Sequence, residues 1–199
     1  MRLIIKEYLA SLGERGKLDE ILPNLLSQMG LIVFSRPTTS GIREFGVDVA
    51  AYGCLPEDES KTKKVFLFSI KAGDIGRTDW DSGPQSLRQS INDITDVYIP
   101  CHMPSEYRDK PIEICICFGG DIKKELRPSV SQFTLSVEAR LENLSFSEWG
   151  GDVLARYMES HLLKEELMPK EVRPLLRKSI AILDESDASY QYFSGVVSL

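Results

Sequence analysis

The sequence has few of the residues that build most metal and cofactor sites. It contains two histidines, His102 and His161, and four cysteines, none of them in a CxxC pair. A zinc site is therefore not expected. The two histidines lie far apart in the sequence, which disfavours a histidine-based nucleophile system, and no glycine-rich phosphate-binding motif is present.

Long apolar runs and an excess of positive charge are also missing. No stretch matches a signal peptide or a membrane span, so we expect a cytoplasmic protein with reduced thiols and no membrane partner. Lys and Arg number 24 against 30 Asp and Glu, a net charge of -6. This balance argues against broad, sequence-independent affinity for nucleic acid, because such affinity depends on basic side chains at phosphates. A local basic groove is compatible with it.

What is present predicts one α/β domain. The chain has 199 residues, 42% of them hydrophobic, which suits a single folded core. Apolar spacing and turn residues predict a mixed central sheet flanked by helices. The expected elements are a helix over 3–29 with a kink or restart at Pro23, strands at 31–35, 46–52 and 65–71, a helix from a capping box at Ser82 to Thr95, a strand at 112–118, a helical region with Pro128, a strand at 144–146, a helix after 149 that Pro169 stops, and a helix at 171–184.

We divide the chain into a core, 1–148, and a C-terminal helical extension, 149–199. Trp149 is expected to hold the last strand against the helix that follows. The amphipathic helices of the extension favour a homo-oligomer, or attachment to a partner or a longer chain. Cys115 and Cys117 alternate with isoleucines, so we expect them to be buried in their strand.

Polar residues on two neighbouring strands mark the candidate centre. Glu44 and Asp48 share the parity of the second strand, and Ser69 and Lys71 that of the third, so each pair faces one side. A lysine at the end of a buried strand is costly without a partner or a task. One interpretation is a structural Asp48–Lys71 ion pair. The other is a magnesium-dependent phosphodiesterase centre, because carboxylates suit Mg²⁺.

The motifs GVDV at 46–49 and FSIKAGD at 68–74, followed by a helix with Gln85 and Gln89, resemble the PD-(D/E)XK, or restriction-endonuclease-like, superfamily. The resemblance covers roughly residues 1–118. It implies a restriction-endonuclease-like core and a metal-dependent endonuclease acting on DNA, with Mg²⁺ as cofactor and Mn²⁺ able to substitute. By analogy with nucleases of this type, the chain is expected to serve as an effector domain in bacterial antiviral defence.

The same resemblance implies roles for single residues. Asp48 matches the main metal ligand and Lys71 the catalytic lysine. Glu44 is expected as an extra acid and the Ile70 carbonyl as a further metal ligand. Gln89 either lines the site or lies on a solvated helix face.

Ser69 departs from the superfamily pattern, which has Glu, Asp or Gln two residues before the lysine. The serine removes a charge and shortens the side chain. Either Glu44 supplies the missing acid, or the metal binds weakly, or the fold has lost catalysis. The alternative function is therefore an inactive nuclease-fold module that binds nucleic acid or protein.

Several exposed side chains are candidates for contacts with nucleic acid. Arg77 and Arg88 follow the third strand, and Lys61, Lys63 and Lys64 form a basic loop that we expect beside the candidate centre. For all five the alternative is a solvated surface charge. Trp80, expected in an acidic loop, either stacks on a base or packs partly into the protein.

Overall fold

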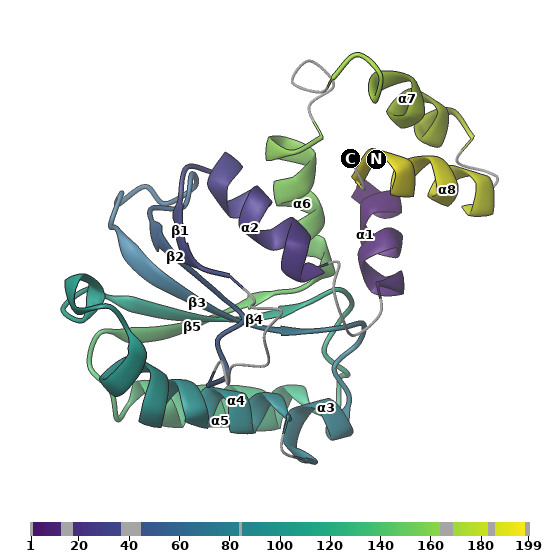
Figure 1. Ribbon diagram of the computed structural model, residues 1–199. Coiled ribbons are helices and arrows are strands. Elements are labelled where there is room, and N and C mark those ends of the chain that lie inside the picture. The colour runs from purple at the N-terminus through teal and green to yellow at the C-terminus, as the bar shows by residue number, and fades with distance from the viewer. Residues whose placement is uncertain are drawn as a thin grey trace.

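The protein is built on one five-stranded mixed sheet with the strand order β1-β2-β3-β4-β5 (Figure 1). β1, β2 and β3 are antiparallel neighbours, whereas β4 and β5 run parallel to β3. The expected α/β class, with a mixed sheet flanked by helices, is confirmed. The strands are β1 (Ile32–Ser35), β2 (Val49–Gly53), β3 (Lys64–Lys71), β4 (Ile112–Phe118) and β5 (Leu144–Trp149). This computed structural model describes residues 2–12, 18–36, 45–83, 85–163, 169–182 and 186–197.

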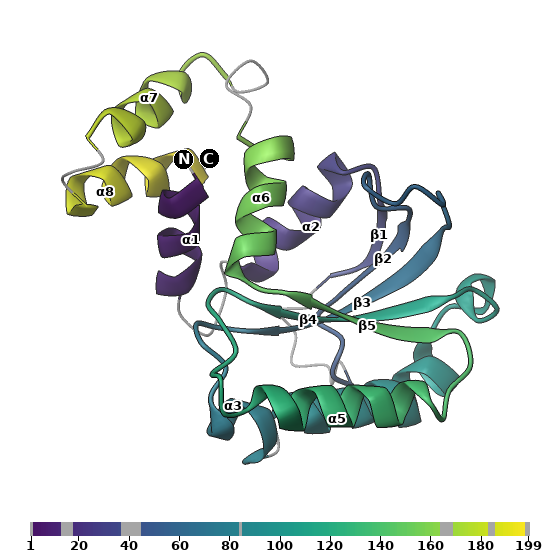
Figure 2. The same ribbon diagram turned by 180° about the vertical axis from the view of Figure 1, so that it is seen from behind.

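Helices α1 (Arg2–Ser11), α2 (Leu18–Gln28) and α6 (Gly151–His161) lie on one side of the sheet (Figures 1 and 2). Their apolar faces and the sheet enclose one buried cluster, here called the first core. α7 (Arg173–Ala181) and α8 (Ser186–Val197) continue this side beyond α1. α8 joins the first core because the ring of Phe193 packs edge-on against Tyr8, with 5.1 Å between centroids.

The opposite side carries α3 (Arg77–Asp81), α4 (Leu87–Asp93), α5 (Arg127–Glu138) and the π-helix η1 (Ile94–His102). A 3-10 turn, η2 (Ser105–Tyr107), follows η1. These elements and the other face of the sheet enclose a second core. β4 is central, and every one of its residues is buried. The expected burial of Cys115 and Cys117 is confirmed, because both face the first core with 0% exposure.

The helical region expected over 3–29 forms, but the kink or restart expected at Pro23 is wrong. The region contains two helices, α1 ending at Ser11 and α2 beginning at Leu18. α2 continues through Pro23, whose ring is buried. The burial of the apolar side chains of α2 stabilises the helix by more than the loss of the backbone hydrogen bond that proline cannot donate. Gly30 follows α2 with φ +88°, the left-handed conformation that ends many helices.

The helix start expected at Ser82 is also wrong. Ser82 ends the short helix α3, and Ser86 caps α4 by accepting the N–H of Gln89 at 3.4 Å. Trp80 lies on α3 rather than in a loop, is 2% exposed and packs edge-on against Phe133. A role for Trp80 in base stacking is excluded because its ring is enclosed.

Other differences concern the ends of elements. The π-helix η1 and the last helix, α8, are absent from the expected elements. β5 runs three residues further than expected, to Trp149. There the indole stacks on Tyr157 of α6, with 5.0 Å between centroids, so its expected role in joining strand and helix is confirmed. Within the described ranges, no helix combines the length and apolar character needed to cross a bilayer.

Candidate active site

The candidate site lies where β3 ends and β2 begins. Asp48 directly precedes β2, and Lys71 is the last residue of β3. Because these strands are antiparallel, both residues come to the same edge of the sheet. β4 and β5 also end at this edge, since they are parallel to β3. Ligands of open α/β sheets bind preferentially outside the carboxyl ends of parallel strands.

Asp48 binds the neighbouring strand through both its backbone and its side chain. Its N–H donates to the carbonyl of Phe68 at 2.8 Å, and its carboxylate Oδ2 accepts the N–H of Ile70 at 2.6 Å. The carboxylate thus extends the β2–β3 ladder by one hydrogen bond beyond Val49, the first residue of β2. This places the acid beside the residue that precedes Lys71.

Lys71 and Ser69 face the second core, because alternation along β3 puts them on the same face as Leu67. The Lys71 side chain is half-buried, while Ser69 is only 1% exposed. No salt bridge joins the two described residues Asp48 and Lys71, so the structural ion pair considered from the sequence is not formed.

The donor set for Mg²⁺ is incomplete among the residues that the structure covers. Asp48 supplies one carboxylate, one oxygen of which is already hydrogen-bonded, and Ser69 supplies no charge. Nowhere in the described ranges do three or more His, Cys, Asp or Glu side chains form a group able to hold a metal. Glu44 lies outside the described residues. A metal site therefore stays a prediction, which depends on Asp48, Glu44 and the Ile70 carbonyl.

Gln89 is exposed on α4, and its Nε2 donates to Oδ1 of Asp93 one turn later, at 2.9 Å. Arg77 and Arg88 are exposed, and the Arg88 guanidinium lies over the ring of Phe133 with 5.1 Å to its centroid. These positions match the solvated faces considered as alternatives, and no described contact joins them to Asp48.

The basic loop does not lie beside the centre, contrary to expectation. Lys61 and Lys63 precede β3 and Lys64 begins it, whereas Lys71 ends it. At about 3.3 Å per residue, a strand of this length separates its two ends by roughly 23 Å. Lys64 instead pairs with Glu113 of β4 at 2.9 Å. That hydrogen bond raises the pKa of Lys64, although burial opposes the shift.

A left-handed turn leads into Asp48. Phe45 has φ +46° and Gly46 has φ +80°. A Cβ on Gly46 would collide with the carbonyl oxygen of Ser90, so only glycine allows this close approach to α4. The sequence motif contains the glycine, but nothing in the pattern indicated that its neighbour Phe45 is also left-handed.

An ionic link at the same edge of the sheet was not anticipated. Lys6 of α1 pairs with Asp152 at 2.8 Å and with Asp121 at 3.4 Å. Asp74 accepts the backbone N–H of Asp121 through Oδ1 at 2.9 Å. These contacts join the segments that follow β3, β4 and β5. Because these residues are far apart in the sequence, no local sequence pattern predicts that they pair.

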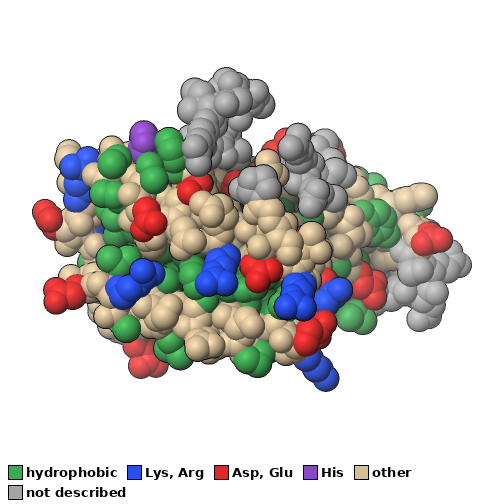
Figure 3. All heavy atoms as spheres, turned by 90° about the horizontal axis from the view of Figure 1, so that it is seen from below, with side chains coloured by type: hydrophobic (Ala, Val, Ile, Leu, Met, Phe, Trp, Pro, Cys, Tyr) green, Lys and Arg blue, Asp and Glu red, His purple; other side chains and the backbone are tan. Residues whose placement is uncertain are grey.

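The face formed by α3, α4 and α5 carries basic and acidic side chains interspersed among neutral ones (Figure 3). In this view the described side chains form no continuous positive surface of the kind that favours duplex DNA. The comparisons with known proteins find no matching family model, no matching curated protein and no matching solved structure.

Proposed function

We propose that this protein is a metal-dependent nuclease that hydrolyses phosphodiester bonds in DNA at the edge of the sheet where Asp48 and Lys71 lie. One observation carries the proposal: the Asp48 carboxylate is bound, at 2.6 Å, to the backbone N–H of Ile70, the residue next to Lys71. An acid and a lysine are thereby held on adjacent strands, at the edge of the sheet where ligands of open α/β sheets preferentially bind.

The chemistry assigns a separate task to each residue. Mg²⁺ would supply charge to polarise the phosphate and to activate water, with Asp48, Glu44 and the Ile70 carbonyl as its proposed protein ligands. Lys71 would orient the attacking water or offset the negative charge that develops on the phosphate. Its half-buried position supports this role, since charge interactions strengthen as water is excluded.

The order of elements also supports the proposal. Helices, three antiparallel strands, further helices and a strand parallel to the third follow one another, and this matches the order that the PD-(D/E)XK resemblance implies. We place attachment to another subunit or domain on the helices beyond β5, which are α6, α7 and α8. We therefore extend the proposal to a cytoplasmic effector domain of bacterial antiviral defence, by analogy of fold.

A second candidate is a catalytically inactive module of the same fold that binds nucleic acid or protein. Two observations favour it. Ser69, at the position of the expected second acid, is 1% exposed, and the Asp48 carboxylate already has a backbone partner. In this alternative Asp48 completes the β2–β3 ladder and coordinates nothing.

Cleavage of supercoiled plasmid, linear DNA and RNA with Mg²⁺, Mn²⁺ or EDTA distinguishes the two. The variants are Lys71→Ala and the matched control Lys110→Ala, an exposed lysine just before β4, at the opposite end of the sheet. Circular dichroism establishes that all three proteins are folded. The nuclease proposal predicts metal-dependent cutting that Lys71→Ala abolishes and Lys110→Ala retains. Cutting retained in Lys71→Ala, or absent from the folded wild type with either metal, would favour the inactive module.

A further inference from the structure

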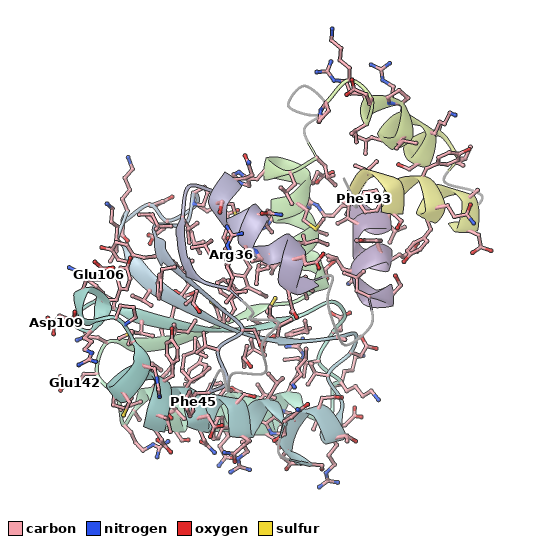
Figure 4. All side chains as sticks on the ribbon, in the orientation of Figure 1. Arg36, Phe45, Glu106, Asp109, Glu142 and Phe193 are labelled. Atoms are coloured by element: carbon pink, nitrogen blue, oxygen red, sulfur yellow. The ribbon has the colours of Figure 1, made fainter. Side chains whose placement is uncertain are left out.

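Beside the candidate site, Phe45 stacks on the exposed ring of His102. The ring of Phe45 lies 4.3 Å from the imidazole of His102, centroid to centroid, and the planes differ by 18°. Phe45 is half-buried and packs against the second core, on the side of the sheet that α4 and α5 cover (Figure 4). His102, at the end of η1, is exposed. One face of the imidazole lies on Phe45, and His102 is exposed as a residue, which motivates a test of whether a third ring stacks there.

The backbone of Phe45 is strained. Its φ of +46° lies in the left-handed region, which is a genuine outlier for a bulky side chain. Gly46 is held against α4 through its approach to Ser90, which keeps the turn in place. Strain of this kind concentrates at functional sites, where the surrounding structure maintains it. Here the turn presents the Phe45 ring to His102.

The pair lies close to the proposed catalytic residues. Phe45 and Asp48 are three residues apart, so their Cα atoms are separated by at most about 11 Å. Phe45 contacts the second core, which is also the side that Ser69 and Lys71 face. A stacked strand advances about 3.4 Å per nucleotide. The separation of Phe45 and Asp48 therefore corresponds to at most about three stacked nucleotides, and His102 stacks on Phe45 at one end of this path.

For a protein with a net negative charge, stacking of bases on aromatic side chains is a more suitable binding mode than contacts to the phosphate backbone alone. The net charge is -6 and basic side chains are interspersed with acidic ones on this face (Figure 3). Base–aromatic stacking contributes to affinity without positive charge and accepts every base. A base within a duplex is already stacked on its neighbours, so it has no free face to offer.

We propose that His102 and Phe45 form a stacking platform for an unpaired base of a single-stranded nucleic acid whose backbone reaches Asp48 and Lys71. This inference rests on the proposed nuclease function and specifies its substrate class.

The test measures fluorescence anisotropy of a labelled DNA oligonucleotide of about 12 nucleotides, within the site sizes known for single-strand binders, in EDTA to prevent cleavage. A second oligonucleotide has the same backbone with abasic positions, and a third is the RNA equivalent. The variants are His102→Ala, the stacking-competent His102→Phe, and His161→Ala as a matched control. His161 lies at the end of α6, on the opposite side of the sheet.

The platform predicts that the wild type binds the base-containing strands and that abasic positions weaken binding. His102→Ala weakens it about tenfold, within the range for loss of one stacked base. His102→Phe restores it and His161→Ala leaves it unchanged. The inference is overturned if His102→Ala or the abasic positions have no effect, or if the folded wild type binds none of the strands.

The plasmid assay separates this inference from the function on which it rests. If cutting depends on Lys71 but binding of the single strands is insensitive to His102→Ala, the stacking platform is overturned and the nuclease proposal stands. If base-dependent binding is lost in His102→Ala but no cutting is detected, the platform is supported and the nuclease proposal is overturned.

Discussion

The carboxylate of Asp48 accepts the backbone N–H of Ile70 at 2.6 Å, outside the regular pairing of β2 with β3. A charged acceptor makes this bond stronger than one between neutral groups. Asp48 is therefore a structural residue of the sheet edge as well as the proposed metal ligand. Substitutions here should affect stability and activity differently.

We expect Asp48→Ala to lower the free energy of unfolding by about 1–3 kcal/mol, because the Ile70 N–H loses its acceptor. Asp48→Asn keeps an acceptor oxygen and should therefore lower the free energy of unfolding by less. Both variants should lose metal-dependent cleavage, because neither retains the carboxylate. Urea denaturation and the plasmid assay provide the two readouts. Equal stability of Asp48→Ala and wild type would show that the hydrogen bond contributes nothing to folding.

Gly46→Ala should destabilise the protein by more than Gly30→Ala. Both glycines have positive φ, +80° and +88°, so both substitutions introduce backbone strain of about 1 kcal/mol. Only at Gly46 does the new methyl group also collide with the Ser90 carbonyl, whereas Gly30 has open space around it. We expect an additional loss of about 1–3 kcal/mol at Gly46, measured by denaturant unfolding. Similar losses at both positions would contradict the close approach to α4.

The four cysteines should react with thiol reagents in distinct classes. Cys101 is exposed and Cys54 is half-buried, while Cys115 and Cys117 are buried. Burial raises the pKa of both buried thiols, so the reactive thiolate is suppressed as well as shielded. With Ellman's reagent at neutral pH we expect Cys101 to react first, then Cys54, and the buried pair only after unfolding. Cys101→Ser should remove the fast phase. Rapid labelling of all four in the folded protein would contradict the burial of β4.

The Lys64–Glu113 pair should make stability depend on pH at the alkaline end. Glu113 is 8% exposed, so Lys64→Met leaves a buried carboxylate unpaired and should cost about 1–3 kcal/mol at neutral pH. The hydrogen bond to Glu113 raises the pKa of Lys64 above its ordinary value of 10.5. The stabilisation is therefore fully present below pH 10.5 and is lost as the pH rises through the higher folded-state pKa.

Unfolding of wild type and Lys64→Met across neutral to alkaline pH measures this difference, with the exposed Lys63→Met as control. The gap between wild type and Lys64→Met should narrow above pH 10.5. A gap that stays constant, or a control that behaves like Lys64→Met, would exclude the pair as its source.

Local patterns predicted most of the elements. The apolar runs of β3 and β4 and the alternation that buries Cys115 and Cys117 need only strand periodicity. Helix boundaries were less well predicted, as Ser82 and Ser86 show. Both are serines with capping chemistry, and which one caps α4 depends on the short helix α3, which forms around the buried Trp80. The basic loop lies far from Lys71 because the extended strand β3 separates its first residue from its last.

By itself, the sequence determined that an acid and a lysine meet at one edge of the sheet, because Asp48 and Lys71 lie at adjoining ends of strands that pair as antiparallel neighbours. The tertiary structure alone decided what surrounds them. The hydrogen bond from Ile70 to Asp48, the approach of Gly46 to Ser90 and the stacking of Phe45 on His102 join segments from separate parts of the chain. Such contacts follow from how the packed layers align, and a pattern of neighbouring residues carries no signal for that alignment.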